Sequence, residues 1–384
     1  MKSLISRIIL CLYVFINALF VDKYISRITS HHWLIAIAYM IGVCAVIWGI
    51  NWLLNNKKFS TKCFWGILIF FPIIAIGIQY AIDPLSIQVD RWSAIHNFLS
   101  GMLQGLYPYG QQTHLGGYGS PFPVWQLLHL PFYIVGNVGL SIIVVTILFL
   151  WTLYRLYPKK VAIAASVLLC ISPAFWYEVA VRSDLITNIM LSAIIVEWLV
   201  HKNIKLNDHW IWIGCIVGLT LSTRFVAVIP ICVIYGYEFL QMNWKKQSLF
   251  IFIVISIFAL TMLPFVFWKG STLLFFDYNP FVLQTRQGSW FVFLIFSIIA
   301  IGGTIWMRGR IAHRWIVTGI LLTSLVTMAF VEKMWQQNLW NGLYTSAFDI
   351  TYLSIALPFY IEYLSCSMAN HSIVLDKHCE NMPF

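Results

Sequence analysis

The residues best suited to chemistry are a few charged side chains in a chain that has very few of them. Only 10% of the 384 residues are Asp, Glu, Lys or Arg, whereas 60% are hydrophobic. A carboxylate can take the proton from a hydroxyl group. A guanidinium group can hold a phosphate through paired hydrogen bonds and stabilise the negative charge that develops on it. Carboxylates and arginines together therefore suit a reaction in which a hydroxyl displaces a phosphate leaving group.

Four charged residues form the candidate site. Asp90 is the candidate general base, and Asp184 is a supporting acid. Arg224 is the candidate contact to a donor phosphate, with Arg182 as a second contact. Charged groups at membrane depth are costly and usually line a wet cavity, so they mark function.

No metal or cofactor is expected at this site. The chain has no Asp-x-Asp triplet, and its eight cysteines show no CxxC spacing. Such carboxylates are what holds a divalent ion on a diphosphate group. Their absence fits a substrate with a single phosphate better, and a divalent cation is possible but not indicated.

Each of these residues also has a simpler structural interpretation. Asp90 precedes a helical pattern and is suited to capping it. Arg182 and Asp184 are close enough in the chain to pair only with each other. Arg224 is able to extend along apolar surface to the lipid headgroups. The sequence leaves these alternatives open.

Four aromatic residues lie in or beside the same region. The segment 83–120 is longer than most structureless loops, which suggests a functional loop. It is rich in Trp, Tyr and Leu, which is not typical of disorder. Its rings are candidates to stack on a sugar or an acceptor. These residues are Trp92, Tyr107, Tyr109 and Tyr118.

The elements that must position these residues are transmembrane helices. A span needs about 20 mainly apolar residues, and the chain supplies many such runs, so we predict an all-α, polytopic helical bundle. The apolar stretch 210–240 is interrupted at 222–224 and predicts two short helices that meet there. The predicted single spans are 4–21, 33–54, 64–82, 139–156, 161–177, 185–200, 248–267, 290–307, 315–331 and 345–364.

The distribution of Lys and Arg predicts the topology. The run 121–135 is short and begins Pro-Phe-Pro, so it either crosses the membrane or lies at its surface. If it does not cross, 16 of the 24 Lys and Arg residues fall on the side of the N-terminus and 8 on the other. Positive residues favour the cytoplasmic side. This predicts twelve spans, one interfacial helix and both termini in the cytoplasm, in the inner or plasma membrane. The net charge of +10 therefore reports topology, and nucleic acid is not an expected partner.

The order of these features resembles the GT-C superfamily of membrane glycosyltransferases. Asp90 is followed by Gly-Leu-Tyr-Pro-Tyr at 105–109, which resembles the first external loop of that superfamily, closest to the mannosyltransferase-like branch. The run 121–136 resembles the juxtamembrane helix that follows the loop. The resemblance implies that Asp90 is the catalytic base. It also places the second acid on Asp184 and the later basic residue on Arg224.

The resemblance further implies a substrate class and a domain organisation. The donor would be a polyprenyl-phosphate sugar carrying a mannose-like hexose or a pentose, and the acceptor a glycan or lipid on the external face. The GT-C-like core would occupy 64–240, after an added pair of spans in 1–63 and before further helices in 241–384. This sequence departs from the superfamily in that its loop follows the third span. No large soluble domain follows the last span.

Other functions remain possible from the sequence. A transporter or flippase for a lipid-linked glycan would show internal repeats and broken helices near mid-membrane, and the chain shows no convincing repeat. A polysaccharide polymerase or ligase would also use external arginines. A structural subunit would not need the charged cluster.

Overall fold

The structure is a computed structural model of the chain. It describes residues 4–56, 61–273, 279–308, 313–338, 343–344 and 348–369. These residues form helices joined by turns and contain no β-strand. The predicted all-helical class is confirmed for this part of the chain.

Six helices of the described residues are long and apolar enough to cross a membrane, and a bent pair makes a possible seventh span. The chain is therefore a multi-pass membrane protein by the length and composition of its helices. The six are α1 (Leu4–Ile25), α2 (His32–Asn56), α3 (Thr61–Ala81), α13 (Trp244–Val266), α15 (Trp290–Met307) and α16 (Arg314–Gln337).

Shorter apolar helices lie between the long ones. The bent pair is α8 (Lys159–Cys170) with α9 (Pro173–Ala180), which meet at an angle of 68°. The predicted span over 161–177 therefore corresponds to two helices with a bend between them, because Pro173 lacks the N–H that would continue the hydrogen-bond ladder. The others are α7 (Leu140–Leu156), α10 (Leu185–His201), α11 (Leu206–Leu221), the 3₁₀ helix η3 (Phe225–Val228) with α12 (Ile229–Gln241), and the 3₁₀ helix η5 (Ile350–Ala356) with α18 (Leu357–Met368).

The break predicted between two half-helices is confirmed. α11 ends at Leu221, and η3 begins at Phe225 and leads into α12. The run 121–135 forms two very short helices, α5 (Pro123–Leu128) and α6 (Leu130–Ile134). Neither is long enough to cross a bilayer, since a span needs about 17 residues or more.

The contacts divide the chain into two compact units. Unit 1 comprises 1–74, 147–178 and 310–384, and unit 2 comprises 75–146 and 179–309. In unit 1, α18 packs against α1, α8 and α16, and almost all of its residues are buried. Tyr13 of α1 donates a hydrogen bond to the Leu168 carbonyl of α8 at 2.6 Å. The three-part division at 63 and 240 stays a prediction.

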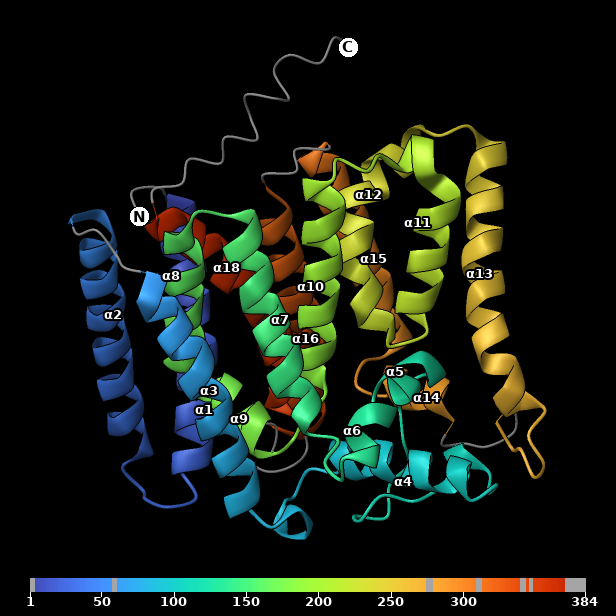
Figure 1. Cartoon of the computed structure of the whole chain (residues 1–384), viewed down its shortest axis with the longest axis horizontal. Helices are drawn as coiled ribbons and strands as arrows, with labels where there is room; N and C mark the ends of the chain where they lie inside the picture. The colour runs from blue at the N-terminus through green and yellow to red at the C-terminus, as the bar shows by residue number, and fades with distance from the viewer. Residues whose placement is uncertain are drawn as a thin grey trace. The chain divides into compact units, whose positions relative to one another are not determined.

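Unit 2 holds all the candidate site residues. α11 packs closely along α13, and α12 contacts both α10 and α15. The short helices α4 (Arg91–Leu103), α5, α6 and α14 (Pro280–Thr285) gather at one end of these longer helices (Figure 1). An aromatic core that includes Phe98, Trp125 and Phe265 joins α4 and α5 to the end of α13. The longer helices thus form a scaffold, and the short helices build a layer over its end.

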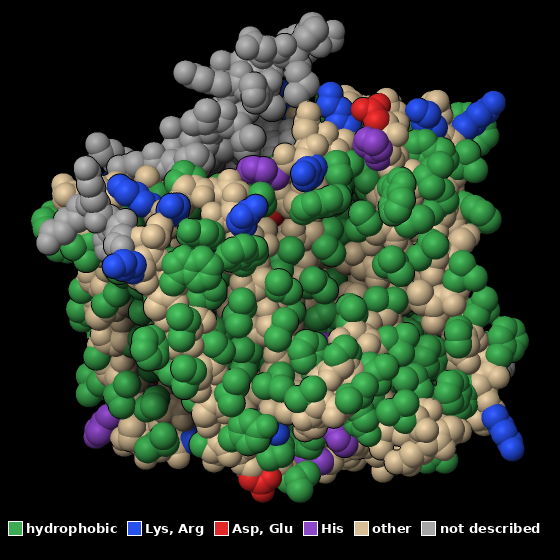
Figure 2. Space-filling view, in the orientation of Figure 1, with side chains coloured by type: hydrophobic (Ala, Val, Ile, Leu, Met, Phe, Trp, Pro, Cys, Tyr) green, Lys and Arg blue, Asp and Glu red, His purple; other side chains and the backbone are tan. Residues whose placement is uncertain are grey.

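The surface matches a membrane protein. Figure 2 shows hydrophobic side chains over the exposed flanks of the helices, whereas charged side chains gather near helix ends. Charges at membrane depth are costly, so this separation fits a lipid environment. Several of the positive residues counted for the topology lie outside the described residues. They are Lys2, Lys57, Lys58, Arg310 and Lys377.

Candidate active site

Asp90 stands directly before α4 but does not cap it. Its side chain makes no hydrogen bond to the first turn of the helix. Its Oδ2 instead accepts a hydrogen bond from the Thr113 hydroxyl at 2.9 Å. Gly117 lies against the same oxygen, because a Cβ built at Gly117 would be only 2.8 Å from it. The carboxylate is half-buried. The interpretation of Asp90 as a simple helix cap is therefore not supported, and its carboxylate is held by the loop that follows α4.

His114 attaches this loop to the start of α4. Its Nε2 lies 2.8 Å from the Ile87 carbonyl, so Nε2 must be the donor. Its Nδ1 lies 2.7 Å from the Ser93 hydroxyl. Because Thr113 is the adjacent residue, these contacts fix the hydroxyl that bonds Asp90.

Arg224 is positioned by the break between α11 and η3. The main-chain N–H of Phe122 donates to the Thr223 carbonyl, and that of Val124 donates to the Ser222 carbonyl, both at 3.1 Å. The first turn of a helix has N–H groups without intrahelical partners, and the last turn has carbonyls without them. The start of α5 and the end of α11 therefore satisfy each other. This pairing places Arg224 beside the loop from α4.

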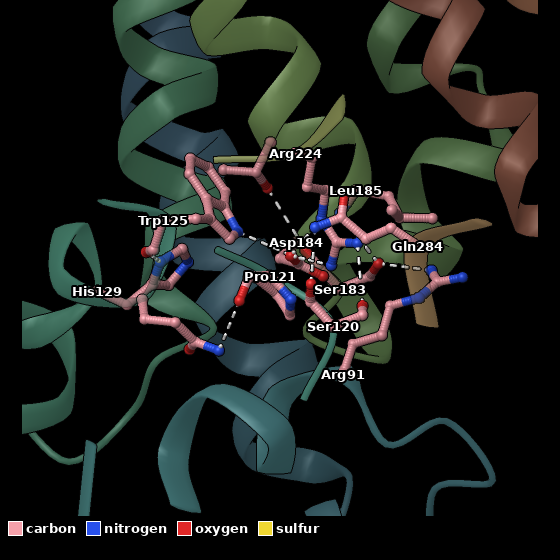
Figure 3. Close-up of polar contacts among 12 residues, drawn as sticks. Arg91, Ser120, Pro121, Trp125, His129, Ser183, Asp184, Leu185, Arg224 and Gln284 are labelled. Carbon is pink, nitrogen blue, oxygen red and sulfur yellow. Dashed lines mark hydrogen bonds and ion pairs between the residues drawn. The ribbon is translucent and has the colours of Figure 1, made fainter. Parts of the chain in front are cut away.

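Asp184 and Arg224 form a buried ion pair. Asp184 Oδ2 accepts hydrogen bonds from Arg224 Nη2 at 2.6 Å and Nε at 3.1 Å, and from Trp125 Nε1 at 2.7 Å (Figure 3). The two charged side chains are only 2% and 5% exposed. Burial would raise the pKa of Asp184, but the Arg224 guanidinium, with help from Arg91 and His129, lowers it below its ordinary value. Asp184 is therefore ionised at neutral pH. The interpretation of Arg224 as a snorkelling residue was wrong.

The contacts around this pair lead back to Asp90. Arg224 Nη1 donates to the Ser120 hydroxyl at 3.3 Å, and Ser120 follows the glycine-rich loop that touches Asp90. On the other side, Arg91 Nη1 donates to the Ser183 hydroxyl at 2.9 Å. Ser183 is the residue before Asp184, and Arg91 is the residue after Asp90. Asp90, Asp184, Arg91 and Arg224 therefore belong to one continuous set of contacts.

Gln284 of α14 joins two of these segments. Its amide nitrogen donates to the Ser120 carbonyl at 2.7 Å, and its amide oxygen accepts from the Phe225 N–H at 2.9 Å. Figure 3 shows Gln284 beside Ser120 and Arg224. Gln284 therefore fixes the distance between the loop before α5 and the residue that follows Arg224.

Sequence reasoning did not assign roles to several of these residues. Trp125, Ser120 and Gln284 are uncharged, and their partners lie tens of positions away in the chain. His129 also lies outside the predicted site. It is 2% exposed, and its Nδ1 lies 2.8 Å from the Trp125 carbonyl, so Nδ1 must donate. Burial lowers the pKa of His129, which favours a neutral ring with a lone pair on Nε2.

Arg182 is not brought to the Asp184–Arg224 pair. Its Nη2 donates to the carbonyls of Gln79 and Ile82 at the end of α3, the latter at 3.3 Å. Basic side chains commonly bond the last carbonyls of a helix in this way. Its backbone is left-handed, with φ of 54°. Arg182, the predicted second phosphate contact, therefore binds the end of α3 instead. Arg91 is the cation that lies beside the Asp184–Arg224 pair.

The predicted aromatic contacts divide into two groups. Tyr109 is 3% exposed and donates to the Pro121 carbonyl at 3.1 Å, so it is a core residue and the predicted sugar contact is not supported. Trp92, Tyr107 and Tyr118 are half-buried and keep some surface. Trp92 packs on His114 with ring centroids 5.3 Å apart, close to the loop that holds Asp90.

The arrangement combines a reachable carboxylate with buried fixed charge. Asp90 is half-buried with one side-chain hydrogen bond, whereas Asp184 is enclosed and paired. The Asp184 Oδ1 and His129 Nε2 atoms are buried without a hydrogen-bond partner among the described residues. No group of three or more His, Cys, Asp or Glu in that part of the chain is placed to hold a metal ion.

No family model matches this chain, and no curated protein or solved structure matches it. The likeness to the GT-C superfamily therefore rests on the sequence motifs.

Proposed function

We propose that the protein is a membrane glycosyltransferase that moves a mannose-like sugar from a polyprenyl-phosphate donor to a glycan or lipid acceptor. The observation that carries the proposal is the contrast between the two carboxylates of one contact set. Asp90 is half-buried and does not cap its helix, while Asp184 is buried in a pair with Arg224. A general base must reach the proton it removes. Asp90 is accessible for this task, and Asp184 is not.

In this mechanism Asp90 accepts the proton of the acceptor hydroxyl while the oxygen of that hydroxyl forms a bond to the sugar carbon. The bond from that carbon to the phosphate oxygen breaks, and the phosphate leaves with the electron pair. Arg91, which is half-buried, lies nearer the surface, and Arg224 contributes its positive charge from its buried position; together they stabilise the charge that grows on the leaving phosphate. Asp184, which also accepts the Trp125 indole N–H, holds the Arg224 guanidinium in place, so the arginine does not have to reorganise during the reaction. Trp92 and Tyr118 provide ring surface for the sugar.

In the proposed arrangement the protein lies in the inner or plasma membrane. It crosses the membrane twelve times and has both termini in the cytoplasm. In addition to the six long helices, the bent pair α8–α9 and the shorter helices α7, α10, α11, α12 and α18 would cross. In this arrangement the layer made by α4, α5 and α14 faces outside, where a lipid-linked sugar is supplied. The excess of Lys and Arg on the opposite side supports it.

The test is transfer from a radiolabelled polyprenyl-phosphate hexose in membranes that contain the full chain. We expect Asp90→Asn to lower the transfer rate by about 10²- to 10⁴-fold, the usual contribution of a positioned base. Asn keeps an oxygen for the Thr113 hydroxyl, so the loop should remain in place.

Asp83→Asn is the matched control. Asp83 is an exposed carboxylate in the same segment, and its Oδ1 accepts from the Leu85 N–H at 3.0 Å. Asn caps a helix about as well as Asp, so this variant should transfer at close to the wild-type rate. Near-normal transfer by Asp90→Asn would overturn the assignment, as would efficient transfer from a soluble nucleotide sugar without a lipid donor.

A further inference from the structure

A row of aromatic and imidazole rings runs from the loop that holds Asp90 to α6. The ring of His114 packs on Trp92 with centroids 5.3 Å apart, and Trp92 packs on His96 at 6.1 Å. His96 in turn packs on Tyr133 at 4.9 Å. α4 and α6, which carry three of these rings, contact each other (Figure 1). All four residues of this ring row are half-buried, so each keeps part of its surface exposed.

The opposite face of α4 fixes the position of the ring row. Ile95, Phe98 and Leu99 are buried in the aromatic core that joins α4 to α13. Trp92 and His96 lie four positions apart, which places them on the same face of the helix. Burial of the core face therefore holds these two rings where they meet His114 and Tyr133.

Two amide side chains lie beside the rings. His96 Nδ1 lies 3.0 Å from Asn97 Oδ1, so Nδ1 must donate and Nε2 is an acceptor. Asn97 Nδ2 donates to the Gln112 carbonyl at 2.7 Å. Gln112 is exposed, and its Nε2 donates to the Tyr118 hydroxyl at 3.1 Å. An amide offers both a donor and an acceptor, so Gln112 is suited to a ligand that carries hydroxyl groups.

The segment that carries the ring row contains no Asp, Glu, Lys or Arg. None occurs between Arg91 and Arg155, and Arg91 itself bonds Ser183. Helices that lie on anionic lipid headgroups are rich in Lys and Arg, so this composition does not favour lipid as the occupant. Carboxylates and phosphates are recognised chiefly by cationic side chains, which this segment does not supply. The composition therefore favours an uncharged, hydroxyl-rich ligand.

We infer that the ring row binds the acceptor, and that the acceptor is a neutral oligosaccharide. This inference rests on the proposed function and narrows the acceptor from a glycan or lipid to an uncharged glycan chain. The C–H face of a sugar packs on aromatic rings, while its hydroxyls bond amides. The row starts at His114, next to the Thr113 that bonds Asp90, so a chain whose terminal hydroxyl lies at Asp90 extends along it. A sugar ring is about as large as an aromatic ring, so four rings accommodate more than one sugar unit.

The first test measures binding without any donor, by calorimetry on the purified full chain in detergent. The neutral probes are mannotetraose, maltotetraose and cellotetraose, and the acidic probe is tetragalacturonate. We expect at least one neutral probe to bind more tightly than tetragalacturonate. Tyr133→Ala should weaken that binding by about 2- to 10-fold. Tyr237→Ala is the matched control, since Tyr237 is a half-buried tyrosine near the other end of α12 from the break at Arg224.

Three results of this test would overturn the inference. They are the absence of binding by every neutral probe, equal or tighter binding of tetragalacturonate, and unchanged binding of the neutral probe to Tyr133→Ala. Dioleoyl phosphatidylglycerol in the micelles should not compete. Full competition by this lipid would show that the ring row holds lipid headgroups and would also overturn the inference.

A charge placed beside the rings tests the same surface at an exposed position that is not part of the core. Gln112→Lys should bind tetragalacturonate about 2- to 5-fold more tightly than wild type does, as expected for a solvent-exposed ion pair. Gln112→Glu, which has the same shape as Gln, should not gain this binding. An unchanged affinity of Gln112→Lys for tetragalacturonate would contradict the placement of the sugar chain at Gln112.

Transfer assays separate this inference from the proposed function. With a polyprenyl-phosphate hexose as donor, wild type and Tyr237→Ala should prefer the bound neutral tetrasaccharide over its monosaccharide by roughly 5-fold or more in kcat/KM, and Tyr133→Ala should lose much of this preference. If the binding pattern holds but no donor supports transfer, the proposed function fails and the ring row stands as a glycan-binding surface. If transfer occurs equally well to both acceptors, the inference is overturned and the proposed function stands.

Discussion

Replacing Asp184 with Asn would leave Arg224 as a buried cation without its counter-ion. Arg224 is 5% exposed and places two of its nitrogens on Asp184 Oδ2, at 2.6 and 3.1 Å. Asn keeps an oxygen that the Trp125 indole N–H can bond, but it carries no charge. Breaking a buried ion pair by removing one partner costs about 3–5 kcal/mol. We expect Asp184→Asn to lower the free energy of unfolding by about that amount.

The reciprocal variant separates the pair from the cost of an isolated charge. Arg224→Gln leaves the Asp184 carboxylate buried without its main partner and should also cost about 3–5 kcal/mol. The double variant has two neutral groups that can still bond each other. Its loss should therefore be smaller than the sum of the single losses, by about 2 kcal/mol or more, as expected for residues in direct contact.

The assay is reversible unfolding of the purified full chain in detergent, followed by tryptophan fluorescence. Asp83→Asn serves as the control, because Asp83 is exposed and Asn preserves its cap. Surface substitutions of this kind usually change stability by less than about 0.5 kcal/mol. Additive losses in the double variant, or an Asp184→Asn protein as stable as wild type, would refute the reasoning about this pair.

Two further predictions concern the loop and the buried histidine. Gly117→Ala would place a methyl group 2.8 Å from Asp90 Oδ2; we expect it to displace the carboxylate and reduce transfer about 10- to 100-fold, while Gly42→Ala, which meets nothing within 4 Å, should not. Burial lowers the pKa of His129, so the unfolded chain binds a proton that the folded chain does not. Stability should therefore fall as pH drops below about 6.5, by at most about 1.4 kcal/mol per pH unit. Measured unfolding of His129→Gln should lack this component, and an unchanged pH profile would contradict the assignment.

The sequence by itself determined the helical membrane class and the main interruptions of its helices. Long apolar runs must form helices in lipid, because no water is present to bond the main chain. The break at 222–224 and the short run at 121–135 were also predicted from local sequence, and the structure has α11, η3 and the short α5 and α6 there. These features depend on residues close together in the chain. The bend at Pro173 was missed, although the proline was visible, because the surrounding apolar run was long enough for one span.

Only the tertiary structure decided which charges meet. Arg182 is two residues from Asp184, yet its left-handed backbone directs it to the end of α3. Asp184 instead pairs with a residue 40 positions away and with Trp125, 59 positions away. Such pairings depend on how helices pack, which no local pattern records. The same applies to Tyr109, whose ring lies in the core with Phe98 and Phe265 because α4 folds over the end of α13.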